Sequence, residues 1–156
     1  MTSRRTQSVA ETQRAGEEFA ALLQPCDIVV LTGTLGAGKT AFTQGLAKGL
    51  GVLDRVTSPT FTLVREHVCS AATGIDRLHH ADLYRTNSLD EIEDLTFEEV
   101  VQPRGVAVVE WGEMGSGLWP ETIWALEIDV IDDDTREIRV TRTPSSERTA
   151  TDWATR

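Results

Sequence analysis

The chain has 156 residues, a formal net charge of −10, 40% hydrophobic residues and 26% charged residues. This composition is ordinary for one globular domain, and so acidic a chain repels phosphate backbones, which argues against unaided nucleic-acid binding. No apolar stretch approaches the roughly 20 residues of a membrane span, and the N-terminus lacks the apolar core of a signal peptide. We therefore expect a cytoplasmic protein that contacts no membrane.

The first part of the chain predicts a helix followed by a buried strand. Residues 1–7 are polar and are expected to be flexible. Ser8 and Glu11 have the spacing of a capping box, which predicts a helix beginning here and ending before Pro25. The continuous apolar run at 28–31 is typical of a strand that is covered on both faces.

A glycine-rich loop follows this strand, and a second helix follows the loop. The helix is predicted by apolar residues at every fourth position: Phe42, Leu46 and Leu50. Glycines at 49 and 51 are typical of a helix C-terminus. The order strand, glycine-rich loop, helix is the context in which phosphate-binding loops occur.

The second half of the chain predicts two hairpins, an acidic helix and another buried strand. The helix is expected to begin at Ser88 and to end before Pro103, and the apolar run at 106–109 predicts the strand. The hairpins pair 61–68 with 77–84 and 122–130 with 136–143.

These elements predict an α/β fold with three layers, in which a central sheet lies between helices on both faces. Residues 8–143 form the single expected domain. Residues 144–156 are rich in Ser, Thr, Pro and Arg, and we expect a disordered tail there.

The segment Gly33–Thr40 matches the phosphate-loop pattern G-x-x-x-x-G-K-[ST] at every fixed position. Its glycines, Gly33, Gly36 and Gly38, let backbone N–H groups approach phosphate oxygens. The ammonium group of Lys39 can reach the β- and γ-phosphates, and the hydroxyl of Thr40 can bind Mg²⁺. The sequence therefore predicts a site for ATP with Mg²⁺.

A P-loop needs an acidic partner at the end of a neighbouring strand, to orient the metal or the attacking water. Glu110 follows the apolar strand at 106–109 and is the first candidate for this role. Asp82 is the second candidate, although a lone carboxylate is more often a surface ion-pair partner. Hydroxyl groups in the loop 57–60 could sense the γ-phosphate, although a segment of this composition is more often a plain turn.

Three histidines and a cysteine raise the possibility of zinc binding: His67, Cys69, His79 and His80. Their spacing matches no standard zinc pattern, so we interpret them as ordinary strand residues.

Four motifs in order resemble the TsaE family, the P-loop ATPase subunits of bacterial tRNA threonylcarbamoyladenosine (t6A) synthesis. They are L-x-G-x-L-G-A-G-K-T, S-P-T-F-T-L-V, H-x-D-L-Y-R and V-E-W-G-E, at Leu31–Thr40, Ser58–Val64, His80–Arg85 and Val109–Glu113. The resemblance spans about residues 8–143. One departure from the family is a lengthened hairpin tip at 71–77.

The resemblance implies a P-loop NTPase-like α/β domain with a mixed central sheet and helices on both faces. It also implies roles for individual residues. Phosphates are held by Leu35, Gly36, Ala37, Gly38, Lys39 and Thr40. Mg²⁺ is bound by Thr40 and Glu110, with Asp82 beside the metal or the γ-phosphate. Thr60 belongs to a loop that responds to nucleotide state, Trp111 packs near the site, and Arg136 can contact the nucleoside.

The resemblance also implies partners. Two other subunits, one of which is the threonylcarbamoyl transferase, assemble with a TsaE protein, and tRNA is contacted only indirectly. ATP hydrolysis, weak in the isolated subunit, supports repeated turnover of the complex.

Other functions fit the phosphate loop as well. A small-molecule kinase would need a lid and a second substrate pocket, for which the later half has little room. A guanine-specific switch normally carries N-K-x-D, and the chain has no Asn-Lys pair. A nucleotide-bound structural subunit without hydrolysis is the third alternative, against which Glu110 and Asp82 argue.

Overall fold

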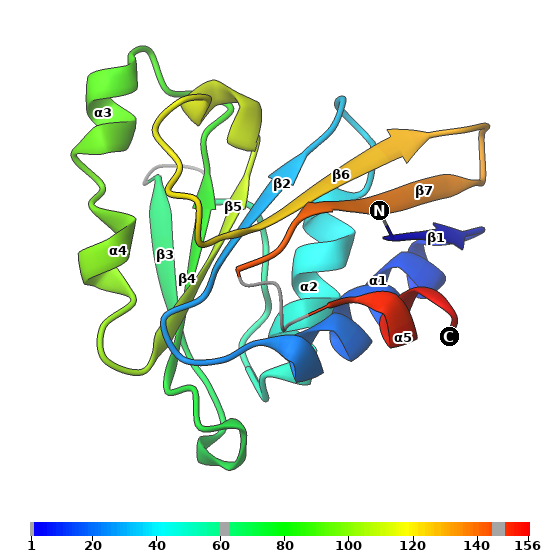
Figure 1. Ribbon diagram of the computed structural model, residues 1–156, viewed down its shortest axis with the longest axis horizontal. Coiled ribbons are helices and arrows are strands. Elements are labelled where there is room, and N and C mark those ends of the chain that lie inside the picture. Colours follow the sequence, from blue (N-terminus) through cyan, green and yellow to red (C-terminus); the bar gives the residue numbers. More distant parts are fainter. Residues whose placement is uncertain (1, 60–62, 145–148) are drawn as a thin grey trace.

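The computed structural model describes residues 2–59, 63–144 and 149–156, which build one seven-stranded sheet (Figure 1). The strand order is β1-β7-β6-β2-β5-β4-β3. The strands are β1 (Thr2–Thr6), β2 (Ile28–Thr32), β3 (Val64–Val68), β4 (Arg77–Asp82), β5 (Gly105–Glu110), β6 (Trp124–Val130) and β7 (Arg136–Arg142). Thr60, which we expected in a nucleotide-responsive loop, lies outside the described residues.

The sheet is mixed, as predicted. β2 runs parallel to both β5 and β6, and β4 runs parallel to β5. The predicted hairpins form as the antiparallel pairs β3–β4 and β6–β7. The carboxyl ends of β2, β4 and β5 therefore meet at one edge of the sheet, where ligands bind in open α/β sheets.

Helices cover both faces of the sheet, which confirms the three-layer α/β architecture. On one face, α1 (Val9–Phe19), the short 3₁₀ helix η1 (Ala20–Leu22) and α2 (Lys39–Gly49) pack against Val29 and Leu31 of β2. On the other face, α3 (Leu89–Glu93) and α4 (Phe97–Val100) pack against Ile28 and Val30. Because side chains alternate along a strand, β2 is apolar on both sides and is fully enclosed.

The capping box predicted at the start of α1 is present. The backbone N–H of Glu11 donates to the Ser8 hydroxyl at 3.1 Å, and the Glu11 carboxylate accepts from the N–H of Gln7 at 2.7 Å. The bond to Ser8 satisfies a donor that the first helical turn cannot pair internally, and the bond to Glu11 holds the chain at Gln7, one residue before the N-cap, so the helix begins at a defined residue.

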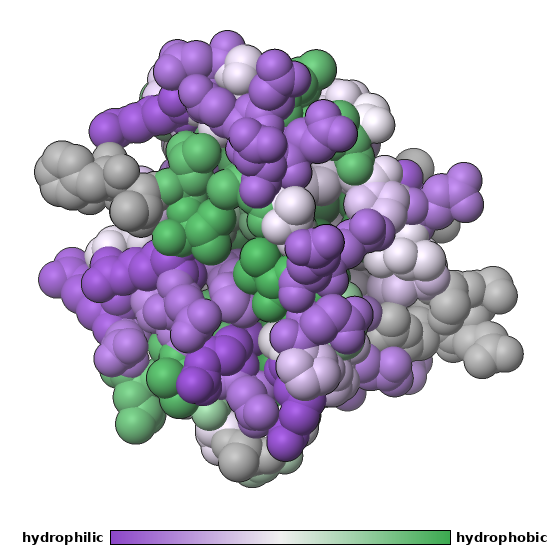
Figure 2. Space-filling view, turned by 90° about the vertical axis from the view of Figure 1, so that its left-hand side faces the viewer, coloured by the Kyte–Doolittle hydropathy of each residue, from purple (hydrophilic) through white to green (hydrophobic). Residues whose placement is uncertain are grey.

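The acidic helix expected from Ser88 is divided into two short helices. The Ser88 hydroxyl accepts from the N–H of Glu91 and caps α3, but Thr96 has φ 44°, in the left-handed region, and interrupts the run before α4. Figure 2 shows this side of the molecule, on which hydrophilic side chains surround smaller hydrophobic patches. The exposed carboxylates of the two helices are Asp90, Glu91, Glu93, Asp94, Glu98 and Glu99.

Both ends of the chain differ from the prediction. Residues 2–6, expected to be flexible, form edge strand β1, paired with β7. In the expected disordered tail, Thr151–Ala154 forms α5, and Trp153 is 2% exposed. The Trp153 indole N–H donates to the Ala15 carbonyl at 2.8 Å, and its ring packs edge-on against Phe19. Contacts between residues distant in sequence therefore order both termini, which lie near one another (Figure 1).

The remaining short helices are η2 (Ala71–Thr73), in the lengthened β3–β4 hairpin tip, and η3 (Gly112–Gly115), after β5. None of the helices in the described ranges combines the length and the apolar character that crossing a membrane requires.

Candidate functional site

The P-loop connects the carboxyl end of β2 to the first residue of α2. Gly38, immediately before the helix, has φ 108°, a conformation that a residue with a Cβ atom rarely adopts. At Gly33, a Cβ atom would lie 2.4 Å from the Ile128 carbonyl oxygen of β6. The glycines therefore fulfil two different requirements, a left-handed backbone and a close approach of neighbouring strands. The loop lies at the N-terminus of α2, where the helix dipole favours an anion.

The Lys39 side chain folds back over the loop. Its ammonium donates to the carbonyl oxygens of Gly33 and Thr34 at 2.6 and 2.8 Å. It also lies 3.8 Å from the centre of the Trp111 ring, a cation–π contact that places Trp111 at the site, as expected. Burial lowers the pKa of Lys39, and the carboxylates of Glu113, Glu110 and Asp82 oppose this shift.

Thr40 and Glu110 meet directly, although they are 70 positions apart in the sequence. The Thr40 hydroxyl donates to Glu110 Oε1 at 2.7 Å and lies 3.0 Å from the Ser58 hydroxyl. Glu110 is 1% exposed at the end of β5. A hydroxyl and a carboxylate oxygen are ligands that suit Mg²⁺, which commonly takes one or two protein oxygens together with phosphate and water. The residues present therefore fit the expected metal.

No larger metal-binding cluster competes with this pair. Among residues 2–59, 63–144 and 149–156, the structure contains no group of three or more His, Cys, Asp or Glu side chains that could hold a metal ion. Cys69, one of the residues considered for zinc, is buried, and burial raises the pKa of its thiol to about 11.

Asp82 ends β4 directly beside Glu110, its register partner on β5. Its carboxylate accepts from the backbone N–H of Tyr84 at 3.0 Å, and the Tyr84 ring packs against Trp111 with 4.7 Å between centroids. The structure therefore brings Asp82, Glu110 and Lys39 to one edge of the sheet, as the sequence predicted. Unlike Glu110, Asp82 is only partly buried and can contact solvent.

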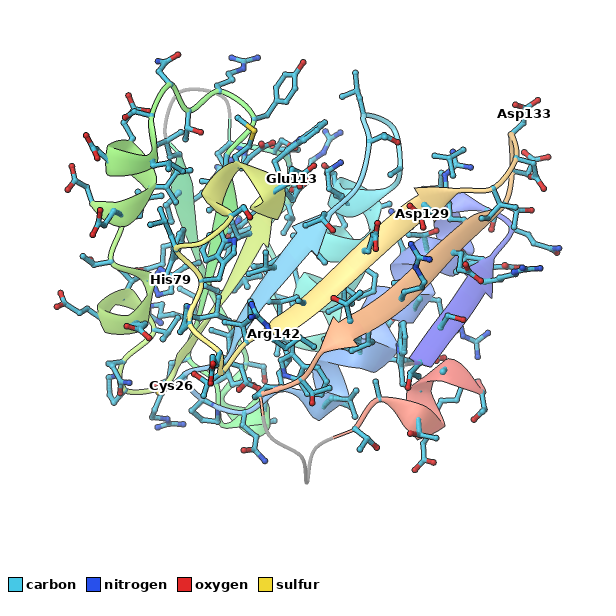
Figure 3. All side chains as sticks on the ribbon, turned by 45° about the horizontal axis from the view of Figure 1, so that its top comes forward. Cys26, His79, Glu113, Asp129, Asp133 and Arg142 are labelled. Atoms are coloured by element: carbon cyan, nitrogen blue, oxygen red, sulfur yellow. The ribbon has the colours of Figure 1, made fainter. Side chains whose placement is uncertain are left out.

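Arg136, at the start of β7, also reaches the P-loop. Its guanidinium donates to the Gly36 carbonyl at 3.4 Å and to the Asp132 carbonyl in the β6–β7 turn at 2.9 Å. Figure 3 labels Asp133 at the tip of this turn and Glu113 in the segment after β5, with the P-loop between them in that view. Of the other P-loop residues, Ala37 is buried, whereas the Leu35 side chain is 75% exposed.

His80 is a site residue that sequence reasoning did not identify. Its ring is fully buried on β4, and its Nε2 forms a short hydrogen bond with Glu110 Oε2. The strand alternation held a usable signal, because His80 is two residues before Asp82 and therefore lies on the same face of β4. His79, its neighbour, lies on the opposite face.

An open groove of about 710 Å³ adjoins the P-loop on the face of the sheet away from α2. Its lining includes Thr34, Trp111, Glu113 and Arg142. The groove therefore offers unfilled space beside the start of the P-loop, at Gly33 and Thr34.

Comparison with known proteins gives one consistent family. A family model described as "Threonylcarbamoyl adenosine biosynthesis protein TsaE" matches residues 6–138. The tRNA threonylcarbamoyladenosine biosynthesis protein TsaE of Streptomyces coelicolor is 46% identical over 143 residues, 90% of this chain and 92% of that protein. The protein of the same name from Treponema pallidum is 41% identical over 135 residues, 86% of this chain and 96% of its own length.

A solved structure agrees with these sequence matches. The crystal structure of Bacillus subtilis YdiB superposes with a TM-score of 0.70 at 34% identity, covering 94% of this chain and 87% of that one. The likeness is consistent with the P-loop NTPase-like architecture of the mixed sheet.

Proposed function

Because this chain belongs to the TsaE family of threonylcarbamoyladenosine biosynthesis proteins, we propose that it binds ATP with Mg²⁺ and hydrolyses it slowly in support of tRNA t6A synthesis. The observation that carries the proposal is the direct hydrogen bond between Thr40 of the P-loop and Glu110 at the end of β5. This bond joins the two residues that are expected to bind the metal. One of them, Thr40, is the last residue of the only segment in the sequence that matches the P-loop pattern.

Phosphate binding is assigned to the backbone of the loop and to Lys39. The N–H groups at the start of α2 point toward the loop and can donate to phosphate oxygens. The Lys39 ammonium adds a positive charge that is held in place by two carbonyl oxygens and shielded on one side by the Trp111 ring. Arg136 lies at the outer rim of the loop, where it can contact the rest of the nucleotide.

The two carboxylates are suited to different tasks in hydrolysis. Both oxygens of Glu110 already accept hydrogen bonds in a buried position, which suits a fixed metal ligand. Asp82 is accessible to solvent and can orient the attacking water and accept its proton. When bound, Mg²⁺ supplies charge that stabilises the transferring phosphoryl group.

Partner subunits, including the threonylcarbamoyl transferase, are proposed to detect the nucleotide state at the mouth of the site. Exposed apolar side chains surround this edge of the sheet, among them Leu35, Tyr84 and Met114. Apolar groups exposed together are typical of interaction surfaces. With a net charge of −10, the chain is poorly suited to gripping tRNA directly, so its contact with tRNA would pass through the partners.

A small-molecule kinase is a second candidate, and one observation favours it. The groove beside the P-loop offers space for a phosphoryl acceptor next to Trp111 and Glu113. Phosphate release measured with purified protein and ATP distinguishes the candidates. An ATPase releases phosphate without an added acceptor, a kinase requires one, and a structural subunit binds ATP without turnover.

The decisive test of the biological role is mass spectrometry of tRNA nucleosides after depletion of the protein. We expect t6A to fall and to recover on expression of the wild type but not of Lys39→Ala. The chain has one other lysine, Lys48, which is exposed and pairs with Glu17, so Lys48→Ala is a matched control that should restore t6A. Unchanged t6A after confirmed depletion would contradict the proposal.

A further inference from the structure

His80 is a buried residue of β4, and its side chain lies on the same face of the strand as Leu78, which belongs to the core under α1 and α2. Its side chain is 0% exposed and that of Glu110 is 2% exposed, so the hydrogen bond between them lies away from solvent. The second carboxylate oxygen of Glu110 points the other way and accepts from Thr40. The carboxylate is therefore held at both oxygens, by His80 on one side and by Thr40 on the other.

The surroundings of the ring indicate which nitrogen carries the proton. A carboxylate oxygen accepts hydrogen bonds, so Nε2, which faces Glu110, is the donor. Nδ1 is buried and has no hydrogen-bond partner among the described residues. An N–H left unpaired in a buried site is costly, and orphaned N–H groups are rare. The arrangement thus favours the tautomer that carries its proton on Nε2 alone.

We propose that His80 is a positioning residue for Glu110: its Nε2–H fixes the carboxylate so that Oε1 faces Thr40 and the magnesium position. The inference rests on the proposed function, because it concerns the same metal site. Groups that hydrogen-bond to a metal ligand orient it, and their loss typically lowers metal affinity about 10- to 100-fold. His80 would act on Mg²⁺ binding without touching the metal or the nucleotide.

Two substitutions at this position separate the hydrogen bond from the bulk of the ring. In His80→Gln, the side-chain amide nitrogen can take the place of Nε2 and still donate to Glu110. In His80→Leu, a buried side chain of moderate size remains but the donor is lost. His79→Gln is the matched control, because His79 is adjacent in sequence and also buried, but lies near Glu66 on the other face of β4.

The experiment measures ADP binding by calorimetry, once with MgCl₂ and once with EDTA, for the wild type and each variant. The ratio of the two affinities is the contribution of the metal. We expect His80→Leu to lower this ratio about 10- to 100-fold while leaving ADP affinity in EDTA nearly unchanged. His80→Gln should retain most of the ratio, and His79→Gln should match the wild type. A wild-type ratio in folded His80→Leu, or equal losses in His80→Gln and His80→Leu, would overturn the proposal.

A second measurement needs neither nucleotide nor a variant that might not fold. Nitrogen NMR of histidine-labelled wild-type protein reports the tautomer, and we expect His80 to carry its proton on Nε2. A proton on Nδ1 alone would overturn the proposal. If the Nε2–H is present but wild-type ADP binding does not depend on Mg²⁺, the metal site of the proposed function fails, and the positioning role fails with it.

Discussion

At the scale of single residues, the site combines groups that solvent cannot reach with groups that it can. Glu110 and His80 are enclosed, whereas Asp82 and Trp111 are partly exposed at the edge of the sheet. A buried carboxylate is costly unless its oxygens are paired, and Glu110 meets this condition through two hydrogen bonds. Substitutions of the two carboxylates should therefore have different effects.

We expect Glu110→Gln to bind ATP in EDTA but to lose most of the strengthening by Mg²⁺ and to hydrolyse ATP poorly, because the metal ligand loses its charge. Asp82→Asn should keep the Mg²⁺ dependence of binding and lose mainly turnover. Calorimetry and a phosphate-release assay on both variants check this division. Equal turnover in Glu110→Gln and the wild type would assign Glu110 a structural role.

His67 should make stability depend on pH. Burial lowers its pKa, and the positive charge of Arg65 acts in the same direction, while the carboxylate of Asp54 opposes the shift. The folded protein therefore keeps His67 neutral, whereas the unfolded chain binds a proton below its ordinary pKa of 6.5. The stability contributed by the neutral ring is complete above that pH and is lost as the pH falls toward the lowered, folded value.

Replacement by an apolar residue removes this titration. We expect His67→Leu to lose less stability than the wild type between about pH 7.5 and about pH 5.5, as measured by urea unfolding at the two values. Both ring nitrogens of His67 lack hydrogen bonds to the described residues, and the Asp54 carboxylate that lies 3.8 Å from Nδ1 is largely exposed, so water can solvate it after the substitution. An identical pH dependence in both proteins would show that other groups dominate acid sensitivity.

At the scale of elements, α1 and α2 pack closely against each other. Glycines on each helix allow the contact: a Cβ atom at Gly16 would lie 2.1 Å from the Phe42 carbonyl oxygen, and one at Gly45 would lie 1.7 Å from that of Gln13. These distances are far too short for a side chain, so the helix backbones touch. Because α2 begins at Lys39, the contact also supports the P-loop.

Gly45→Ala should destabilise the protein, although alanine is the better helix former by about 1 kcal/mol. The added methyl group would force the helices apart, and such overpacking costs roughly 1–3 kcal/mol or more. Thermal unfolding checks the sign, and Lys48→Ala on the exposed side of the same helix should change stability by only about 0.5 kcal/mol. A higher melting temperature for Gly45→Ala would contradict the packing argument.

The C-terminal helix should contribute strongly to stability. Trp153 is buried against Phe19, and Arg4 of β1 lies over its ring. We expect Trp153→Ala to cost about 3 kcal/mol, which for a chain of this length lowers the melting temperature by roughly 6–12 °C. The exposed Arg156 provides a control, since Arg156→Ala should have little effect. Calorimetric unfolding that leaves Trp153→Ala within 1–2 °C of the wild type (roughly 0.5 kcal/mol or less) would refute this role.

At the scale of the whole molecule, the features readable from the sequence are those encoded locally. The P-loop, the apolar strands β2 and β5 and the carboxylate of Glu110 each occupy a short segment with a recognisable pattern. The terminal elements could not be predicted, because β1 is polar and Trp153 finds its partners more than a hundred residues away. Alternation along β4 places His80 on the same face as Asp82, but the contact of His80 with Glu110 also depends on the pairing of β4 with β5, which the alternation does not specify.

The small size of the domain and its partly open site lead us to expect a weak ATPase that other subunits stimulate. Phosphate release by the isolated protein should be slow and should increase when the partner subunits of t6A synthesis are added. The same mixture prepared with Lys39→Ala identifies the source of the activity, since stimulation should then disappear. Stimulation that persists with this variant would place the hydrolysis in another subunit.

The contact between the backbones of α1 and α2 has a mechanical consequence. Two helices whose backbones touch at Gly16 and Gly45 resist sliding or tilting independently, so we expect the pair to act as a rigid platform beside the proposed nucleotide site. If the protein signals its nucleotide state as proposed, we expect the motion in the segments around this platform, such as the loop 52–59 that carries Ser58. Spin labels on α1 and α2 should keep one separation throughout the nucleotide cycle, while a label on that loop should move relative to both.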